Sequence, residues 1–116
     1  MLKTADDMIR EIQPHIECVD VATAKKIYEA NPDAAIIDVR EAHSADKSKL
    51  SESVNISPGL LEMKVHQVCP LASTVILTHC GGGGRASLAA HTLQQIGYEN
   101  VYAITAPYDE IKKTFG

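Results

Sequence analysis

One stretch in the second half of the chain decides the fold: VILTHCGGGGRASLAAHTLQQIG, residues 75–97. Its first five residues are mostly apolar or β-branched, as in a buried strand. From Ala86 onward, apolar residues recur with the period of a helix, and Gly97 follows as a typical C-terminal stop. The order strand, tight loop, helix is typical of parallel α/β sheets, which bind ligands at the carboxyl ends of their strands. Cys80 is therefore predicted to lie at a ligand-binding edge.

The rest of the chain alternates strands and helices in the same way. An amphipathic segment ends by Pro14, and residues 41–52 are expected to form a polar loop. This alternation predicts an α/β fold with a central, mostly parallel sheet of about five strands and helices on both faces. We expect a single domain, 1–116, with an N-terminal helix in 1–14 and a core at 17–113. The expected strands are 17–19, 34–39, 54–56, 74–78 and 101–104, and the expected helices are 21–30, 59–68, 86–96 and 107–113.

Length and charge narrow the possible partners. A chain of 116 residues can bury roughly two thirds of its unfolded surface, so its core needs neither disulfide nor metal. The net charge of −4, with no cluster of Lys and Arg, argues against a nucleic-acid partner. No stretch approaches membrane-spanning length, and the N-terminus lacks a signal-peptide pattern. We therefore expect a cytoplasmic protein without a membrane partner.

The cysteines and histidines give no sign of a disulfide framework or a metal site. Three cysteines without close spacing fit a reducing compartment, and Cys18 and Cys69 are expected to be structural, with a resolving-thiol role as the alternative. Neither a Cys-x-x-Cys nor a His-Glu-x-x-His motif is present, and the histidines show no paired ligand spacing. We predict no metal and no cofactor.

The loop after the strand can change the chemistry of its cysteine. Successive glycines allow backbone N–H groups to turn inward around negative charge, and the helix start and Arg85 add positive charge. All three effects favour the thiolate, so we hypothesise that the pKa of Cys80 lies below the ordinary thiol value of roughly 8.5. The alternative is a flexible turn beside a small buried hydrophobic residue.

The spacing between Cys80 and Arg85 separates two kinds of chemistry. Cysteine phosphatases use Cys-x5-Arg to surround a tetrahedral dianion, whereas four residues separate the two here. A smaller ring of amides suits a smaller guest, such as the terminal sulfur of a persulfide. The loop resembles the active-site loop Cys-x-x-Gly-x-Arg of the rhodanese family of sulfurtransferases, with Cys80, Gly83 and Arg85 on the pattern.

The resemblance extends over residues 17–113. IIDVRE at 36–41 is similar to the family's Asp-Val-Arg-Glu signature, and VNI at 54–56 is similar to its Ala-x-Asn-Ile segment. GLLEMK at 59–64 resembles a stretch of small single-domain members, and GYENVY at 97–102 resembles the turn into the last strand. Two segments depart from the pattern: KLSESV at 49–54 replaces Gly-His-x-x-Gly-Ala, and APYDEI at 106–111 replaces Gly-Gly-Tyr-x-x-Trp. Both departures concern access to the substrate.

The resemblance implies a thiosulfate sulfurtransferase. Cys80 would be the nucleophile and carry a persulfide, taking sulfane sulfur from thiosulfate or a persulfide donor and passing it to cyanide or a thiol, including a protein thiol. The substrate would be bound by Gly81, Gly82, Gly83, Gly84 and Arg85. The alternatives are a non-catalytic module that binds sulfur species or protein partners and, less favoured by the short loop, a cysteine phosphatase or arsenate reductase.

Other polar residues near the strand ends are given structural roles. Asp38, Arg40 and Glu41 are interpreted as a structural ion pair, with substrate contact as the alternative. Glu62 is a candidate for orienting Arg85 or another basic group. His79 precedes the nucleophile, and because adjacent strand residues point to opposite faces, it is predicted to be a packed residue and not a base.

Overall fold

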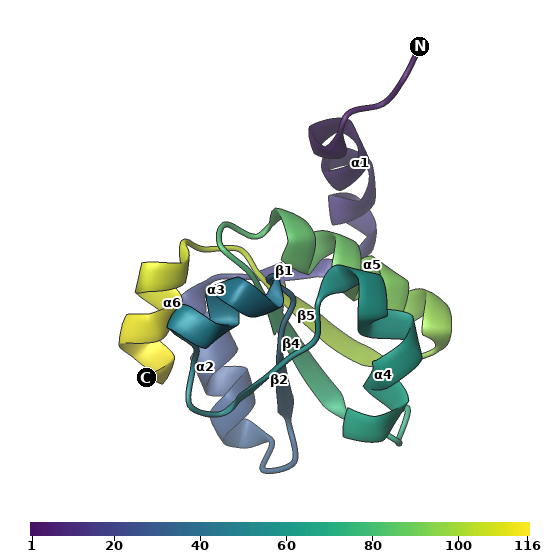
Figure 1. The fold of residues 1–116 in the computed structure, drawn as a ribbon. Coiled ribbons are helices and arrows are strands. Elements are labelled where there is room, and N and C mark those ends of the chain that lie inside the picture. The colour runs from purple at the N-terminus through teal and green to yellow at the C-terminus, as the bar shows by residue number, and fades with distance from the viewer.

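The computed structural model describes residues 1–116, and its centre is one five-stranded sheet. The strand order is β1-β5-β4-β2-β3, and all four pairings are parallel (Figure 1). The predicted α/β fold with five strands is thus confirmed, and the sheet is parallel throughout. The strands are β1 (Glu17–Val19), β2 (Ala35–Asp38), β3 (Ser53–Asn55), β4 (Val75–His79) and β5 (Asn100–Ile104).

Helices cover both faces of this sheet, as predicted. On one face, α1, α4 and α5 pack over a core that includes Ile37, Ile76 and Val101, and on the other, α2 and α6 pack over Ile36 and Leu77. Both Ile76 and Leu77 are fully buried, as expected for a central strand covered on two sides. The helices are α1 (Ala5–Ile12), α2 (Val21–Ala30), α3 (Ala42–Lys47), α4 (Leu61–Val68), α5 (Gly84–Ile96) and α6 (Tyr108–Phe115), with 3-10 turns at Gln13–His15 and Pro58–Leu60.

The N-terminal helix α1 extends away from the body of the molecule (Figure 1). It begins at a capping box, in which the Thr4 hydroxyl accepts from the Asp7 N–H and the Asp7 carboxylate accepts from the Thr4 N–H. At its other end, Ile9 lies against the start of α5, and the Gln13 side chain donates to the Ser87 hydroxyl at 3.3 Å. The end of α1 therefore lies beside the first turn of α5.

The expected polar loop at 41–52 was wrong in part, because α3 lies inside it. This short helix buries only Ala45, so it has no apolar period that a sequence reading can detect. The other differences concern boundaries: α5 begins at Gly84, two residues early, and residues 58–60 form a 3-10 turn before α4. These shifts leave the order of elements as predicted.

The topology places two strand ends at the reversal point of the sheet. From β2 the chain continues outward to β3, and from β4 it continues outward in the opposite direction to β5. The carboxyl ends of β2 and β4 are neighbours, with Asp38 paired to His79 in the register. Because ligands of open α/β sheets bind at such a reversal point, the residues that follow these two strands are the candidates for a site.

Candidate functional site

Cys80 lies at the reversal point, directly after β4. Its side chain is nearly enclosed, with 2% of its surface exposed. The sulfur accepts two backbone hydrogen bonds, from the Gly83 N–H at 3.1 Å and from the Ala86 N–H at 3.4 Å. Two donors directed at one sulfur favour negative charge on it, because hydrogen bonding to the charged form stabilises that form.

The same loop holds further backbone donors. The N–H groups of Gly81, Gly82, Gly84 and Arg85 make no hydrogen bond within the chain. Of the residues predicted to surround the sulfur, only Gly83 donates to it directly, and the second donor, Ala86, was not among them. The sequence contains a signal for Ala86 as a donor, because Ala86 begins the expected helix at 86–96 and the first N–H groups of a helix have no partner within it.

Gly83 gives the loop its shape. Its φ is +99°, a left-handed conformation, and a Cβ atom at this position would lie 3.0 Å from the Thr105 Cα. Both conditions make any side chain at this position strained. Its carbonyl accepts from the Ser87 hydroxyl at 2.7 Å, and the Thr78 hydroxyl donates to the Ala86 carbonyl at 2.8 Å. These buried hydroxyl groups fix the turn from β4 into α5.

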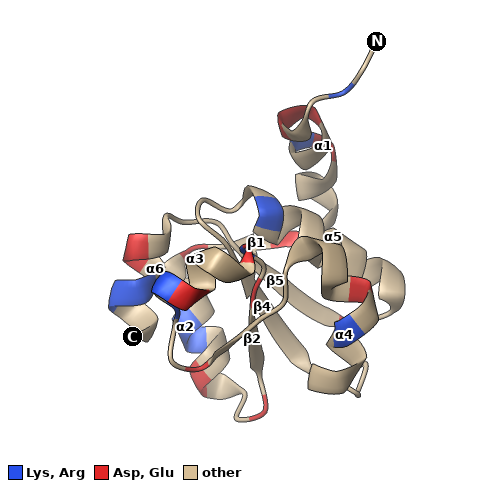
Figure 2. Cartoon of the chain, viewed as in Figure 1, with Lys and Arg blue, Asp and Glu red and all other residues tan.

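Arg85 is exposed in the first turn of α5, where Figure 2 shows a basic segment. Its guanidinium extends back along the loop, because a Cβ atom on Gly81 would lie 4.0 Å from Arg85 Nη2. Arg85 forms no ion pair. Glu62, the candidate for orienting it, lines the same small cavity without pairing with it. The loop thus carries one free positive charge.

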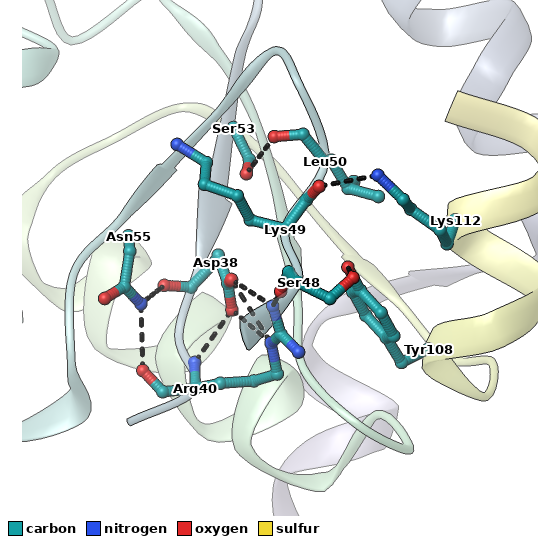
Figure 3. Close-up of polar contacts among 9 residues, drawn as sticks. All are labelled: Asp38, Arg40, Ser48, Lys49, Leu50, Ser53, Asn55, Tyr108 and Lys112. Atoms are coloured by element: carbon teal, nitrogen blue, oxygen red, sulfur yellow. Dashed lines mark hydrogen bonds and ion pairs between the residues drawn. The ribbon is translucent and has the colours of Figure 1, made fainter. Parts of the chain in front are cut away.

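A buried ion pair lies behind the loop, at the end of β2. Arg40 donates through Nη2 to Asp38 Oδ2 at 2.8 Å and through Nε to Oδ1 at 3.0 Å (Figure 3). Burial tends to raise the pKa of Asp38, but the hydrogen bonds from Arg40 outweigh it and the pKa lies below its ordinary value. The predicted structural ion pair is confirmed for Asp38 and Arg40, whereas Glu41 is exposed and takes no part in it.

Tyr108, the first residue of α6, connects this ion pair to the loop. The Arg40 guanidinium carbon lies 4.0 Å from the centre of the Tyr108 ring. The Tyr108 hydroxyl forms a 2.8 Å hydrogen bond with the Ser48 hydroxyl, and its backbone N–H donates to the Gly81 carbonyl at 3.2 Å. Sequence reasoning missed this role, because the contacts join four segments that are distant along the chain.

The two segments that depart from the rhodanese pattern lie side by side in the structure. Lys112 Nζ donates to the Lys49 carbonyl at 2.7 Å, close to the contact between Tyr108 and Ser48 (Figure 3). Leu50 of the first segment is buried in the same apolar cluster as Ala106 and Ile111 of the second, so the two departures pack against a common core.

His79 is fully buried on the face opposite Cys80, stacked against Tyr108 with ring centres 6.1 Å apart. Neither ring nitrogen has a hydrogen-bond partner. The pKa of His79 lies below its ordinary value, chiefly because burial disfavours the charged ring, while Asp38 opposes and Arg40 reinforces that shift. His79 is a packed residue, as predicted, and no contact makes it a base for Cys80.

The other two cysteines lie away from the loop. Cys18 is exposed on the edge strand β1, and Cys69 is buried at the end of α4, where burial raises its pKa. No three His, Cys, Asp or Glu side chains gather closely enough to hold a metal ion. None of the helices combines the length and apolar character needed to cross a membrane.

Comparison with known proteins identifies the family of this chain. The family model described as "Rhodanese-like domain" matches residues 20–114. The chain belongs to the rhodanese-like domain family. No curated protein matches it.

Several solved structures share the rhodanese-like fold. A human single-domain sulfurtransferase aligns with a TM-score of 0.71 at 16% identity, over 85% of this chain and 97% of that one. A rhodanese with anions from E. coli aligns with a TM-score of 0.62 at 20% identity, over 66% and 89%. A protein of unknown function from Rhodopseudomonas palustris, described as a possible tyrosine phosphatase, aligns with a TM-score of 0.81 at 23% identity, over 100% and 94%. At these identities the likeness supports the fold.

Proposed function

We propose that this rhodanese-like protein is a sulfurtransferase that carries sulfur as a persulfide on Cys80. The observation that carries the proposal is the pair of backbone N–H groups, of Gly83 and Ala86, directed at the Cys80 sulfur. Backbone donors directed at a sulfur suit the anionic sulfur of a cysteine nucleophile and of the persulfide that it would form. No neighbouring base is needed, which fits the location of His79 on the other face.

The first half-reaction loads the enzyme. The Cys80 thiolate attacks the outer sulfur of thiosulfate, the sulfur–sulfur bond of thiosulfate breaks, and sulfite leaves with the electron pair. Arg85 is free to attract the doubly charged donor, since no carboxylate in the chain neutralises it. A persulfide donor would react in the same way, with its thiolate as leaving group.

The second half-reaction releases the sulfur. A nucleophilic acceptor, either cyanide or a thiolate, attacks the outer sulfur of the persulfide, and the electron pair of the breaking bond returns to Cys80. Between the two steps the outer sulfur is anionic. The N–H groups of Gly81, Gly82, Gly84 and Arg85, unbonded within the chain, are available to stabilise it, as preorganised donors stabilise an oxyanion.

Turnover with thiosulfate and cyanide tests the proposal. We expect thiocyanate formation by the natural sequence and none above background with the Cys80→Ser variant. A Cys69→Ser variant is the matched control, because that buried thiol lies outside the loop. Equal rates for the natural protein and Cys80→Ser would contradict the proposal and favour a non-catalytic module, an alternative suggested by the near-complete burial of Cys80.

Phosphatase chemistry is the second candidate, since the structure from Rhodopseudomonas palustris is described as a possible tyrosine phosphatase. The four-residue spacing between Cys80 and Arg85 argues against it, because a shorter ring has fewer amides to surround a tetrahedral dianion. Hydrolysis of a chromogenic phosphate ester that disappears in Cys80→Ser would favour the phosphatase over the sulfurtransferase.

A further inference from the structure

A small cleft lies between the start of α4 and the first turns of α5. One wall is formed by Pro58, Leu61 and Glu62, and the other by Arg85, Leu88 and Thr92. Its volume is about 90 Å³. Because one water molecule occupies about 30 Å³ of liquid, a cleft of this size suits a small ligand.

The cleft borders the Cys80 loop. Arg85 belongs both to its wall and to the loop, and its guanidinium extends toward Gly81, the residue after the nucleophile. Leu61, in the opposite wall, is buried in the same apolar cluster as Cys80 and Ala86. A molecule bound in the cleft therefore has one end beside the arginine of the proposed active site.

The two charged groups of the cleft have opposite sign and no partner. Glu62 is exposed on α4, Arg85 is exposed on α5, and neither forms an ion pair or a side-chain hydrogen bond. Figure 2 shows the acidic and basic segments on the two helices that border the cleft. Opposite charges that line one cavity without pairing match a ligand that carries both charges.

We propose that this cleft is the acceptor subsite and that it binds a small zwitterionic thiol, an α-amino acid with a thiol side chain. The carboxylate of the ligand pairs with Arg85 and its ammonium group with Glu62, which directs its thiolate to the outer sulfur on Cys80. The thiolate forms a bond to that sulfur, the persulfide bond breaks, and the electron pair returns to Cys80. The size of the cleft favours a single amino acid over a peptide. This inference rests on the proposed function.

A thiol series on loaded protein tests the subsite. The protein is treated with thiosulfate, freed of excess reagent, and mixed with one of four thiols. Cysteine carries both charges and N-acetylcysteine only the negative one. Cysteamine carries only the positive charge, and 2-mercaptoethanol carries neither. Loss of the persulfide is followed by mass spectrometry after quenching. Each rate is divided by the rate of the same thiol with a free low-molecular-weight persulfide, which removes intrinsic reactivity. We expect cysteine to exceed each single-charge thiol by about fivefold, the size of one exposed ion pair.

Two variants separate the charges. In Glu62→Gln, the ratio of the normalised rate with cysteine to the rate with N-acetylcysteine should fall by about fivefold. The ratio of the rate with cysteine to the rate with cysteamine should not change. The matched control is Glu99→Gln, an exposed glutamate before β5 that does not line the cleft, which should keep both ratios. Equal normalised rates for all four thiols would overturn the subsite, and so would a preference for cysteine over N-acetylcysteine that persists in Glu62→Gln. In either case, loading of Cys80 by thiosulfate would still support the proposed function. Failure of Cys80 to load would overturn both.

Discussion

Two arginines at the same edge of the sheet have opposite surroundings. Arg40 is 7% exposed and bound to the Asp38 carboxylate, the Ser48 carbonyl and the Tyr108 ring. Arg85 is exposed and has no ion pair, and the loop that carries it has four unbonded N–H groups. The comparison shows how the molecule divides its polar groups: those of the Asp38–Arg40 pair bind each other, and those of the loop remain available to a ligand.

The largest expected effect on stability comes from breaking the buried pair. Asp38→Ala leaves Arg40 charged and largely buried without its partner, so the free energy of unfolding should fall by about 3–5 kcal/mol. Urea unfolding followed by circular dichroism measures the change. An exposed acidic residue, Glu41→Ala, is the control and should change stability by less than about 0.5 kcal/mol. A loss below about 1 kcal/mol for Asp38→Ala would mean that the pair contributes little.

The next effect concerns the glycines of the loop, which are not equivalent. Gly83→Ala places a Cβ in a left-handed conformation and 3.0 Å from the Thr105 Cα, so it should cost about 1–3 kcal/mol. Gly82→Ala is the matched control, because no atom lies within 4 Å of its Cβ position. Thermal unfolding compares the two. Equal melting temperatures would show that the loop adjusts freely and is not shaped by Gly83.

The buried histidine predicts a pH dependence. Because the folded-state pKa of His79 is lowered, the unfolded chain binds this proton more readily, and stability should fall as the pH drops below about 6.5. The slope from this group is at most about 1.4 kcal/mol per pH unit and ends once the folded ring is protonated. Asp38, whose pKa is also lowered, acts in a separate range, since its contribution is lost below about pH 4.

Replacement of the ring isolates its effect. His79→Leu removes two buried nitrogens that have no partner, so stability at neutral pH should be unchanged or increase, and the slope just below pH 6.5 should flatten. Urea unfolding at several pH values measures both, with the exposed His43→Leu as control. A steep slope that persists in His79→Leu would assign the pH dependence to other groups.

The smallest effect on stability is expected at the free arginine. Arg85→Gln removes an exposed side chain without an ion pair, so unfolding should change by less than about 0.5 kcal/mol. Its effect should appear instead in the loading of Cys80 by thiosulfate, which we expect to slow by about tenfold or more because a charge-assisted contact is lost. A large loss of stability with normal loading would reverse the roles assigned to the two arginines.

The sequence predicted the parts of this molecule that depend on local pattern. Strand β4, the loop and α5 follow one another within 23 residues, so periodicity and glycine content were sufficient to place Cys80 at the end of a strand. The pair of Asp38 and Arg40 was accessible for the same reason, since only one residue separates them. Helix α3 was missed because it buries a single alanine and lacks an apolar period.

The contacts that were not predicted join distant segments. Tyr108 meets Arg40, Ser48 and Gly81 only after the sheet has assembled, and no spacing along the chain encodes these distances. Glu62 was expected to orient Arg85, but the two side chains line one cleft without pairing, and this arrangement depends on how α4 packs beside α5. Contacts within one strand–loop–helix unit can therefore be predicted from the sequence, whereas contacts between such units cannot.

The central claim, that the loop holds Cys80 as a nucleophile able to carry a second sulfur, is tested most directly by mass spectrometry of the intact protein after exposure to thiosulfate. The account predicts the gain of one sulfur atom, mapped to Cys80 by digestion, absent in Cys80→Ser and lost on addition of cyanide or a thiol. An unmodified Cys80, or a sulfur found on the exposed Cys18 instead, would contradict it.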